Sequence, residues 1–337
     1  MPAPRPKRTA PDVLNFDRLA AALPAQEGRR VAVTGCTSGM GLVLAELAAR
    51  KGAQVIMLNR PSPRAEDALA RLRAIGPADL VPCDLASFAS VRAAGARLRQ
   101  MLGTGGLDVL ACNAGVMGMP DVATEDGYDL QMQANHLSHF LLTHEVWPLL
   151  EQAAARRGEA RVVQHSSGAR KSRKAAKGVF DPAFLERRGG ALGGDRWPGM
   201  GKWRRYRQSK LANLLFTYAL QDRADRQPGN RVKALCAHPG PTDSGLQVKT
   251  TQAGGDTILD RFILRSTLAI AQSPEDGTCG LARACFDPEA PGGGFYGPDP
   301  VARTGAALLL PPERDPAAEA QLWQGSLAAT GIGDFFA

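Results

Sequence analysis

The chain has 337 residues, of which 44% are hydrophobic and 22% are charged, and its formal net charge is +8. This composition is typical of a globular protein and excludes disorder as the main state, and the length suffices for one large domain or two small ones. No stretch approaches the roughly 18 uninterrupted apolar residues of a membrane-spanning helix.

The positive charge is concentrated in one segment of the chain. Twelve Lys or Arg but only three Asp or Glu fall between Arg170 and Arg207, so the rest of the chain is close to neutral. A protein that binds nucleic acid usually spreads its basic residues over a face or a stripe. The charge distribution therefore predicts no nucleic-acid partner.

Residues 1–28 are expected to form an N-terminal arm, in which a disordered basic stretch precedes a short helix around Phe16–Leu23. The stretch has no apolar core of the kind that a secretory signal needs, and Asp12 and Asp17 are unusual in a transit peptide. The six cysteines form no C-x-x-C pair, which predicts small buried side chains rather than a disulfide framework or a zinc site. These features indicate a reducing compartment and favour the cytoplasm, with a plastid or a membrane surface as the alternatives.

From residue 29 onward, short apolar runs alternate with helical patterns. The apolar runs predict strands at Arg30–Thr34, Gln54–Leu58, Leu80–Cys83, Leu107–Ala111, Ala160–Gln164, Val232–Cys236 and Gly294–Tyr296. The helical patterns predict helices at Gly41–Arg50, Ala65–Ile75, Phe88–Leu102, Gly127–Leu150 and Arg204–Arg223. This alternation predicts an α/β fold of the Rossmann type. Residues 29–337 would form a single domain with a doubly wound parallel sheet of about seven strands and helices on both faces.

Two segments interrupt the alternation. One is a basic insert at residues 170–203, and the other is residues 245–270, which carries no strand pattern. Both follow predicted strands and so lie at the carboxyl edge of the sheet, where such folds bind ligands. Apolar residues of the second segment, among them Leu246, Ile258 and Phe262, predict a lid over a lipophilic substrate.

A glycine-rich turn follows the first predicted strand. Gly35 permits a tight turn, Gly39 lets the backbone approach a pyrophosphate, and Gly41 allows the helix to pack closely on the strand. The helix that begins here, with Met40 in its first turn, presents N–H groups and a partial positive charge to phosphates. An ordinary βα turn is the alternative, but the position at the first βα junction favours a dinucleotide site.

The end of the second predicted strand indicates which dinucleotide binds. NAD sites usually have Asp or Glu here for the ribose hydroxyls, but this chain has Asn59 and Arg60. The guanidinium of Arg60 can pair with a 2′-phosphate, and Ser38 can add a hydroxyl contact. We therefore expect NADP(H), with NAD(H) as the alternative. Asp84, after the third strand, is placed either to bind the adenine amine or to cap a turn.

Tyr206 and Lys210 are four residues apart on a predicted helix and so share one face. A neighbouring cation favours the phenolate, so we expect Lys210 to lower the pKa of Tyr206 toward a value useful for proton transfer. On its own this spacing is common and usually marks two surface residues.

Taken together, these motifs resemble the short-chain dehydrogenase/reductase superfamily. In this order and spacing, the resemblance rests on Thr34–Gly41, Cys83–Leu85, Cys112–Gly115, Asn135, Ser166–Ser167, Tyr206–Lys210 and His238–Ser244. The stretches Tyr206–Thr217 and Ser273–Thr278 look like the retinol-dehydrogenase-like branch, which also holds WW-domain oxidoreductase relatives. Protochlorophyllide oxidoreductases are a nearby branch.

The resemblance implies a role for each catalytic residue. Tyr206 would be the general acid in reduction and the base in oxidation, and Lys210 would bind the nicotinamide ribose. Ser167 would polarise the substrate oxygen, and Asn135 would hold a water in a proton relay, with a structural amide at a helix kink as the alternative. Further cofactor contacts are implied for Asn113, Ala114, Gly115, Pro239, Gly240 and Ser244.

No metal site is expected. His136 and His139 are three residues apart on one helix, but no third ligand at a fixed spacing is evident, so packing or surface roles are expected for both. His165 precedes the serine pair, and the sequence suggests no function for it.

These inferences predict an NADP(H)-dependent oxidoreductase that interconverts a lipophilic aldehyde or ketone and its alcohol. The alternatives are a protochlorophyllide-type tetrapyrrole reductase and a nucleotide-sensing scaffold on the same fold. The basic insert is either a solvated loop or a rim that attracts an anionic partner or a membrane headgroup, with Trp197 and Trp203 at the interface. The resemblance also suggests a homodimer that pairs through the two long helices.

Overall fold

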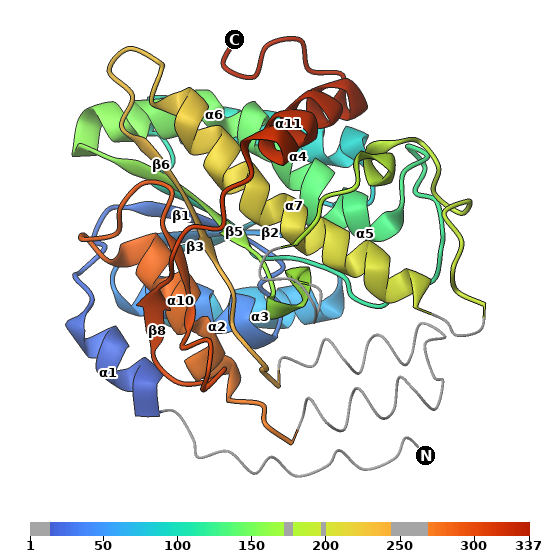
Figure 1. Cartoon of the computed structure of the whole chain (residues 1–337). Helices are drawn as coiled ribbons and strands as arrows, with labels where there is room; N and C mark the ends of the chain where they lie inside the picture. The colour runs from blue at the N-terminus through green and yellow to red at the C-terminus, as the bar shows by residue number, and fades with distance from the viewer. Residues whose placement is uncertain (1–13, 172–177, 197–199, 244–268) are drawn as a thin grey trace.

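A computed structural model of the chain describes residues 14–171, 178–196, 200–243 and 269–337, and a sheet of eight strands lies at its centre (Figure 1). The strands are β1 (Arg30–Thr34), β2 (Gln54–Asn59), β3 (Ala78–Pro82), β4 (Val109–Cys112), β5 (Ala160–His165), β6 (Val232–Ala237), β7 (Phe295–Pro298) and β8 (Ala307–Leu309). β1, β2, β4 and β5 are buried along nearly their whole length, as a parallel sheet covered on both faces requires.

Helices cover both faces of the sheet. One layer holds α1 (Leu14–Ala22), α2 (Gly39–Arg50), α3 (Pro63–Arg73) and α10 (Pro274–Phe286). The opposite layer holds α4 (Phe88–Leu102), α5 (Leu130–Met132), α6 (Ser138–Arg157), α7 (Gly201–Ala224) and α11 (Pro316–Thr330). Each layer encloses its own apolar core against the sheet.

The strand order is β3-β2-β1-β4-β5-β6-β7-β8, and every neighbouring pair is parallel except β7 and β8. The order reverses between β1 and β4, which leaves a ligand-binding crevice at the carboxyl ends of these two strands. The predicted Rossmann fold and its first seven strands are confirmed. The sequence pattern missed β8 because only Ala307 of its three residues is buried, so no apolar run marks it.

The helix predicted at 127–150 is divided in the structure. Asp129 caps the short α5, residues Gln133–Leu137 form a π-helical turn, and α6 continues from there. Such turns are rare and are frequent at functional sites. Asn135 lies in the middle of this one.

The helix expected around Phe16–Leu23 is present as α1 and packs on α10. The carboxylate of Asp276 accepts hydrogen bonds from the backbone N–H groups of Asn15 (3.1 Å) and Phe16 (2.9 Å). Phe16 and Leu23 are both buried in the core of this layer. The expected disordered stretch before α1 lies outside the described residues.

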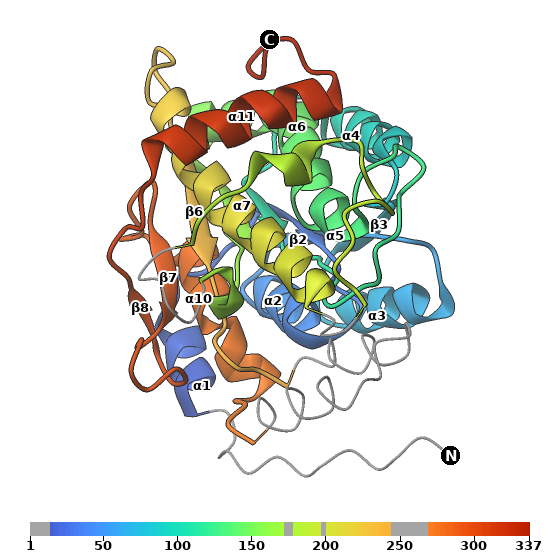
Figure 2. The same ribbon diagram turned by 45° about the vertical axis from the view of Figure 1, so that its right-hand side comes forward.

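The sequence pattern did not reveal the two C-terminal helices. α11 lies across α7 (Figure 2), and its Trp323 meets Phe335 with ring centroids 4.8 Å apart. Phe335 also contacts Phe140 of α6, at 5.0 Å between ring centroids. The C-terminal segment thus closes the core on which the helices beside the crevice rest.

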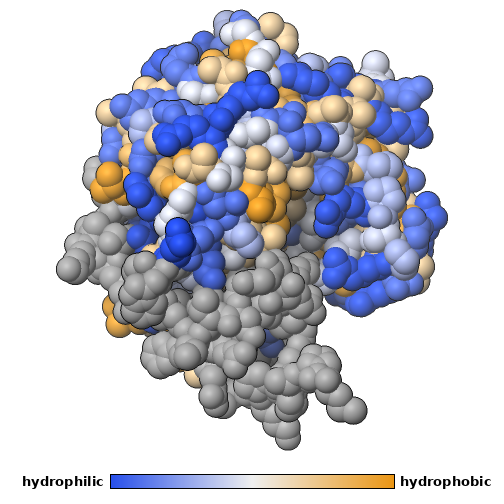
Figure 3. Space-filling view, turned by 90° about the vertical axis from the view of Figure 1, so that its right-hand side faces the viewer, coloured by the Kyte–Doolittle hydropathy of each residue, from blue (hydrophilic) through white to orange (hydrophobic). Residues whose placement is uncertain are grey.

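The face of the molecule in Figure 3 mixes hydrophilic and hydrophobic residues, and the hydrophobic ones form small separate patches. Within the described ranges, no helix is long and apolar enough to cross a membrane. All six cysteines are free and buried, as their sequence context predicts.

Candidate active site

A cleft of about 1640 Å³ opens at the carboxyl ends of the parallel strands. Among the described residues, its walls come from the glycine turn after β1, the end of β2, the loops after β3 to β6 and the first half of α7. Pockets for drug-sized ligands usually measure roughly 300–1,000 Å³. This cleft is therefore large enough for two ligands side by side.

The glycine turn leaves the N-terminus of α2 open toward the cleft. Gly35 and Gly39 have φ of +70° and +58°, a left-handed conformation that favours glycine. Ser38 is the N-cap of α2 but makes no side-chain capping hydrogen bond, whereas a Ser or Asp side chain caps α3, α4, α10 and α11. A Cβ at Gly41 would lie 2.4 Å from Nδ2 of Asn113, so a side chain does not fit there. An uncapped helix N-terminus of this kind is suited to an anion.

Asn113 joins the end of β4 to the glycine turn. Its Nδ2 donates to the carbonyl oxygens of Thr34 (3.0 Å) and Gly35 (3.3 Å), and a Cβ at Gly35 would lie only 2.8 Å from Ala114. Its Oδ1 is therefore an acceptor, and this atom lies 3.0 Å from Nδ1 of His165. Burial lowers the pKa of His165 to about 3, so the neutral ring must carry its proton on Nδ1. His165 thus holds Asn113 in place.

Arg60 and Arg64 line the cleft at the end of β2 and the start of α3. Both are exposed, and within the described part of the chain neither forms an ion pair with a carboxylate. The sequence pattern pointed to Arg60 but not to Arg64, which the first turn of α3 brings to the same cleft. Asp84 also lines the cleft, and its Oδ1 accepts the N–H of Ala86 at 3.0 Å, which is the turn-capping role weighed as an alternative.

Asn135 is fully buried and fastens the π-helical turn to two neighbouring segments. Its Oδ1 accepts the N–H of Val116 (2.7 Å), and its Nδ2 donates to the carbonyl of Val116 (2.9 Å) and to Oγ of Ser209 (2.8 Å). The structural role weighed for this amide is therefore present. A Cβ at Gly115 would lie 3.0 Å from Oδ1 of Asn135 and 3.1 Å from Nζ of Lys210, so these two polar groups flank Gly115.

Tyr206 and Lys210 lie on the face of α7 that lines the cleft. Nζ of Lys210 donates to the carbonyl oxygen of His165 at 2.9 Å, and burial lowers the pKa of Lys210 to about 8. Burial raises the pKa of Tyr206, and a hydrogen bond with the side chain of Ser167 opposes this effect. The expectation that Lys210 lowers the pKa of Tyr206 is therefore not met, because burial dominates the shift and the opposing effect comes from Ser167 rather than Lys210. Ser166 has a different role: its Oγ donates to the carbonyl of Lys210 at 2.7 Å.

Comparison with known proteins identifies the family. A family model described as short chain dehydrogenase matches residues 29–180. The polyprenol dehydrogenase of Mus musculus is 34% identical over 329 residues, which cover 95% of this chain and 89% of that protein. The retinol dehydrogenase 14 of Homo sapiens is 35% identical over 235 residues, which cover 65% of this chain and 63% of that protein. A crystal structure of an uncharacterised protein from Mycobacterium paratuberculosis matches with a TM-score of 0.69 and 32% identity, and covers 93% of this chain and 97% of that one.

This chain belongs to the short-chain dehydrogenase/reductase family. It is an oxidoreductase of the retinol-dehydrogenase-like type, and its family binds NAD(P) and acts on alcohol and carbonyl groups. The cleft of this short-chain dehydrogenase/reductase fits such a dinucleotide, because the uncapped start of α2 can face the pyrophosphate and two arginines line the same cleft. Pro239 and Gly240 line the same cleft, and a Cβ at Gly240 would lie 2.2 Å from the carbonyl oxygen of Arg303.

Apolar residues from the loop after β4, from α5 and from the start of α7 also line the cleft. They are Met117, Met119, Leu130, Met200 and Trp203. The sequence pattern pointed to the segment 245–270 for apolar contacts with a substrate and did not reveal this set. The methionines after Gly115 were the available signal, since flexible thioethers are frequent at adaptable binding surfaces. Trp203 thus lines the cleft, whereas the sequence analysis considered it for a membrane interface.

The described part of the basic insert uses much of its charge in ion pairs. Arg170 is buried and makes a two-pronged contact with Glu313 (Nε–Oε2 3.1 Å, Nη2–Oε1 2.6 Å). Nζ of Lys171 lies 2.7 Å from the same carboxylate, and Nη2 of Arg204 lies 2.8 Å from Oδ2 of Asp181. These contacts tie the insert to the domain, so this part is not a freely solvated loop.

The two helix histidines make separate contacts within the core. Nε2 of His136 lies 2.8 Å from Oγ of Ser326, and Nε2 of His139 lies 2.9 Å from Oγ1 of Thr34. Burial lowers the pKa of His136 to about 3 and that of His139 to about 4, so both rings are neutral at pH 7. The predicted packing roles are confirmed.

Three predicted features lie outside the described residues. They are Ser244, the expected lid at 245–270 apart from its last two residues, and Trp197 of the insert. Thr242, which the sequence analysis did not single out, is buried beside Pro239 and lines the cleft.

Proposed function

We propose that this protein is an NADP(H)-dependent oxidoreductase that interconverts a lipophilic aldehyde or ketone and its alcohol, with Tyr206 as the acid/base residue. The observation that carries the proposal is the gathering of Ser167, Tyr206 and Lys210 in one cleft with the open N-terminus of α2. These residues supply a proton donor, a cation and a hydroxyl on one side, and an anion-binding helix end on the other.

The proposed preference for NADP(H) rests on Arg60 and Arg64. A guanidinium group is planar and can bind a 2′-phosphate through two parallel hydrogen bonds. The end of β2 carries no carboxylate to hold the ribose hydroxyls of NAD(H), since Asn59 occupies that place. Because Arg60 and Arg64 are exposed and have no acidic partner in the described chain, no protein carboxylate competes with a phosphate for their guanidinium groups.

In the proposed reduction, Tyr206 donates its phenolic proton to the carbonyl oxygen as the carbonyl carbon receives a hydride. The nicotinamide supplies that hydride when it is bound. The ammonium of Lys210 stabilises the phenolate left behind, and the hydroxyl of Ser167 donates a hydrogen bond to the oxygen while charge develops on it. Asn135 acts on the same site by holding the π-helical turn against Ser209, one residue before Lys210. In oxidation the proton returns to Tyr206, and the hydride leaves the carbon for the nicotinamide when that cofactor is bound.

The proposed substrate class is lipophilic and of isoprenoid type. The wall of Met117, Met119, Leu130, Met200 and Trp203 is apolar, and the similarity extends over nearly the whole chain to an enzyme named for polyprenol. Such a wall binds by excluding water from hydrocarbon, so affinity should grow with chain length until the cleft is filled.

Purified protein assayed with NADPH and NADH against isoprenoid aldehydes, aliphatic aldehydes and steroid ketones tests the proposal. The expected result is turnover of at least one isoprenoid aldehyde with NADPH, lost on Tyr206→Phe while NADPH still binds. NADPH binding without turnover of any compound would contradict the proposal and favour the nucleotide-sensing scaffold. Reduction of a tetrapyrrole alone would favour the protochlorophyllide-type alternative.

A further inference from the structure

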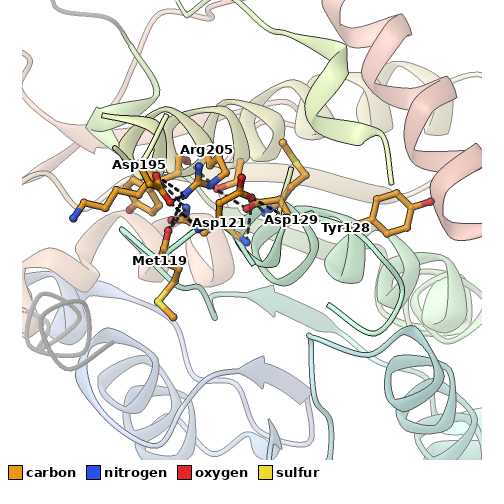
Figure 4. Close-up of polar contacts among 12 residues, drawn as sticks. Met119, Asp121, Tyr128, Asp129, Asp195 and Arg205 are labelled. Atoms are coloured by element: carbon orange, nitrogen blue, oxygen red, sulfur yellow. Dashed lines mark hydrogen bonds and ion pairs between the residues drawn. The ribbon is translucent and has the colours of Figure 1, made fainter. Parts of the chain in front are cut away.

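The buried guanidinium of Arg205 joins several segments around the substrate side of the cleft (Figure 4). Arg205 directly precedes Tyr206 on α7 and is only 1% exposed. Its Nη2 donates to the two carboxylate oxygens of Asp195 at 2.8 and 2.7 Å and to the carbonyl of Met119 at 3.2 Å. Its Nη1 donates to the carbonyl of Gly193 at 3.0 Å. The side chain of Arg205 thus connects α7 to the insert and to the loop after β4 by hydrogen bonds.

Asp129 extends this contact to the segment that carries Asn135. Its Oδ2 lies 3.2 Å from Nε of Arg205, and its side chain is fully buried. Its Oδ1 accepts the N–H groups of Gln131 (3.1 Å) and Met132 (2.9 Å), which caps α5 just before the π-helical turn.

Asp121 fastens the insert from the opposite side. Its carboxylate accepts the N–H groups of Gly190 (2.9 Å) and Gly193 (2.6 Å), and its own N–H donates to Oδ2 of Asp195 at 2.8 Å. Figure 4 shows Asp121, Asp129 and Asp195 around the guanidinium, whereas Tyr128 points away from them. We call these three carboxylates and Arg205 the Arg205 network.

The chemistry of the network indicates positioning rather than simple stabilisation. A buried ion pair contributes little net stability, because desolvation of the charges offsets their attraction, and an apolar cluster could hold the segments at least as firmly. A guanidinium instead imposes one geometry, because its five N–H donors lie in a fixed plane. Here that plane sets how the loop after β4 and the insert lie against α7.

The segments that the network joins also form the apolar wall of the cleft. Met119 offers its carbonyl to Arg205 and lines the cleft, and Met200 and Trp203 line it from the turn of α7 that precedes Arg205. Gln131 contributes as well, since its Nε2 donates to the carbonyl of Lys202 at 3.0 Å. The same segments therefore carry both the polar contacts of the Arg205 network and the apolar wall of the cleft.

We propose that Arg205 is a positioning residue that sets the shape of the substrate pocket by holding the insert and Met119 against the N-terminal end of α7. The inference rests on the proposed function, because it concerns the substrate of that same reaction. When the network loosens, the wall that a bulky lipophilic substrate contacts is displaced. The contacts of Tyr206 and Lys210 with Ser167 and His165 lie outside the network, so a small substrate loses little.

Steady-state kinetics of the full chain with NADPH, hexanal and farnesal test the inference. The main variant is Asp195→Asn, which keeps the size of the side chain while removing its charge. The side chain of Asp195 is 32% exposed, so the substitution buries no new polar group completely. The KM for farnesal should rise about tenfold, while kcat for both aldehydes and KM for hexanal stay within about twofold. Arg205→Lys should act in the same direction, because a single ammonium nitrogen cannot reach Asp129, Gly193 and Asp195 at once, as the three guanidinium nitrogens do.

Arg204→Gln is the matched control. Arg204 neighbours Arg205 on α7 and its Nη2 lies 2.8 Å from Asp181 of the insert, but it is exposed and does not line the cleft. Loss of this ion pair should leave both KM values unchanged.

Equal losses with the two aldehydes in Asp195→Asn would overturn the inference, because a network that merely stabilises the fold affects both substrates alike. An unchanged KM for farnesal beside normal turnover of hexanal would also overturn it, without touching the proposed function. A wild-type protein that reduces neither aldehyde nor any other carbonyl compound would contradict the proposed function, and the inference with it.

Discussion

Nζ of Lys210 donates a hydrogen bond to the carbonyl oxygen of His165, with 2.9 Å between the two atoms. This bond ties the catalytic helix α7 to the end of the central strand β5, and the side chain of the same His165 holds Asn113 beside the glycine turn. The proposed catalytic cation and the proposed phosphate site therefore share a support. A substitution that displaces Lys210 should therefore also affect the glycine turn, and the reverse should hold.

The first prediction concerns pH. Burial lowers the pKa of Lys210 from 10.5 to about 8, so its charge is present below pH 8 and lost as the pH rises through that value. If the charge helps to hold the cofactor, the Kd for NADPH should increase above about pH 8, by up to about tenfold per pH unit. Fluorescence titration of NADPH between about pH 7 and about pH 10 measures this slope.

Lys210→Arg is the control for the pH prediction, because a guanidinium stays charged throughout this range. Its NADPH affinity should be weaker than that of the wild type but nearly independent of pH. A slope as steep in Lys210→Arg as in the wild type would assign the titration to another group.

The second prediction concerns Gly115. In Gly115→Ala, the added Cβ would lie 3.0 Å from Oδ1 of Asn135 and 3.1 Å from Nζ of Lys210, and both groups must shift to make room. Overpacking of this kind costs about 1–3 kcal/mol of unfolding free energy, and a displaced catalytic group can lower kcat/KM by about 100-fold. Denaturant unfolding and steady-state kinetics measure the two effects separately.

Gly333→Ala is the matched substitution for Gly115→Ala. Among the residues that the structure describes, no heavy atom beyond its chain neighbours lies within 4 Å of an added Cβ at Gly333, and the residue is exposed. Activity and stability should both stay at wild-type values. Wild-type activity in Gly115→Ala would show that Lys210 tolerates displacement and would contradict the prediction.

The third prediction concerns cofactor choice. Arg60→Asp removes a cation from the end of β2 and adds the carboxylate that NAD sites use, so the ratio of kcat/KM for NADPH over NADH should fall by about 100-fold. Arg64→Gln should lower the same ratio by about tenfold, without improving the use of NADH. Arg97→Asp, on the outer surface of α4, should leave the ratio unchanged. An unaltered ratio in Arg60→Asp would remove the role proposed for this residue.

The fold could be predicted because burial on both faces turns a parallel strand into an apolar run. Gln54–Leu58 and Val232–Cys236 stand out for this reason, and β2 and β6 extend each by a single residue. β8 and α11 could not be predicted in this way. Two of the three residues of β8 are exposed, and the residues of α11 become buried only through tertiary contacts, as when Trp323 meets Phe335 and Phe140.

The proposed catalytic motif could be predicted because its spacing reflects one helix face, which makes Tyr206 and Lys210 neighbours before any tertiary contact is known. The supports of the motif follow no such spacing. Arg205 is adjacent to Tyr206 in sequence, yet its partners come from the insert and from the start of α5, and only the folded chain brings them together. The net effect on the pKa of Tyr206 was also beyond the sequence, because it depends on the depth of burial.

The last prediction concerns His165, for which the sequence suggested no function. Nδ1 of its neutral ring donates to Oδ1 of Asn113 at 3.0 Å, and Nδ2 of Asn113 then donates to the carbonyls of Thr34 and Gly35 in the glycine turn. His165→Leu fills the space but leaves Oδ1 of Asn113 without its donor, which should cost about 1–3 kcal/mol of unfolding free energy. The loosened turn should also weaken NADPH binding by about tenfold. His165→Gln keeps an N–H donor on a side chain of similar length and should restore most of both quantities. Equal defects in the two variants, measured by denaturant unfolding and by NADPH titration, would show that ring packing rather than the hydrogen bond to Asn113 supports the site.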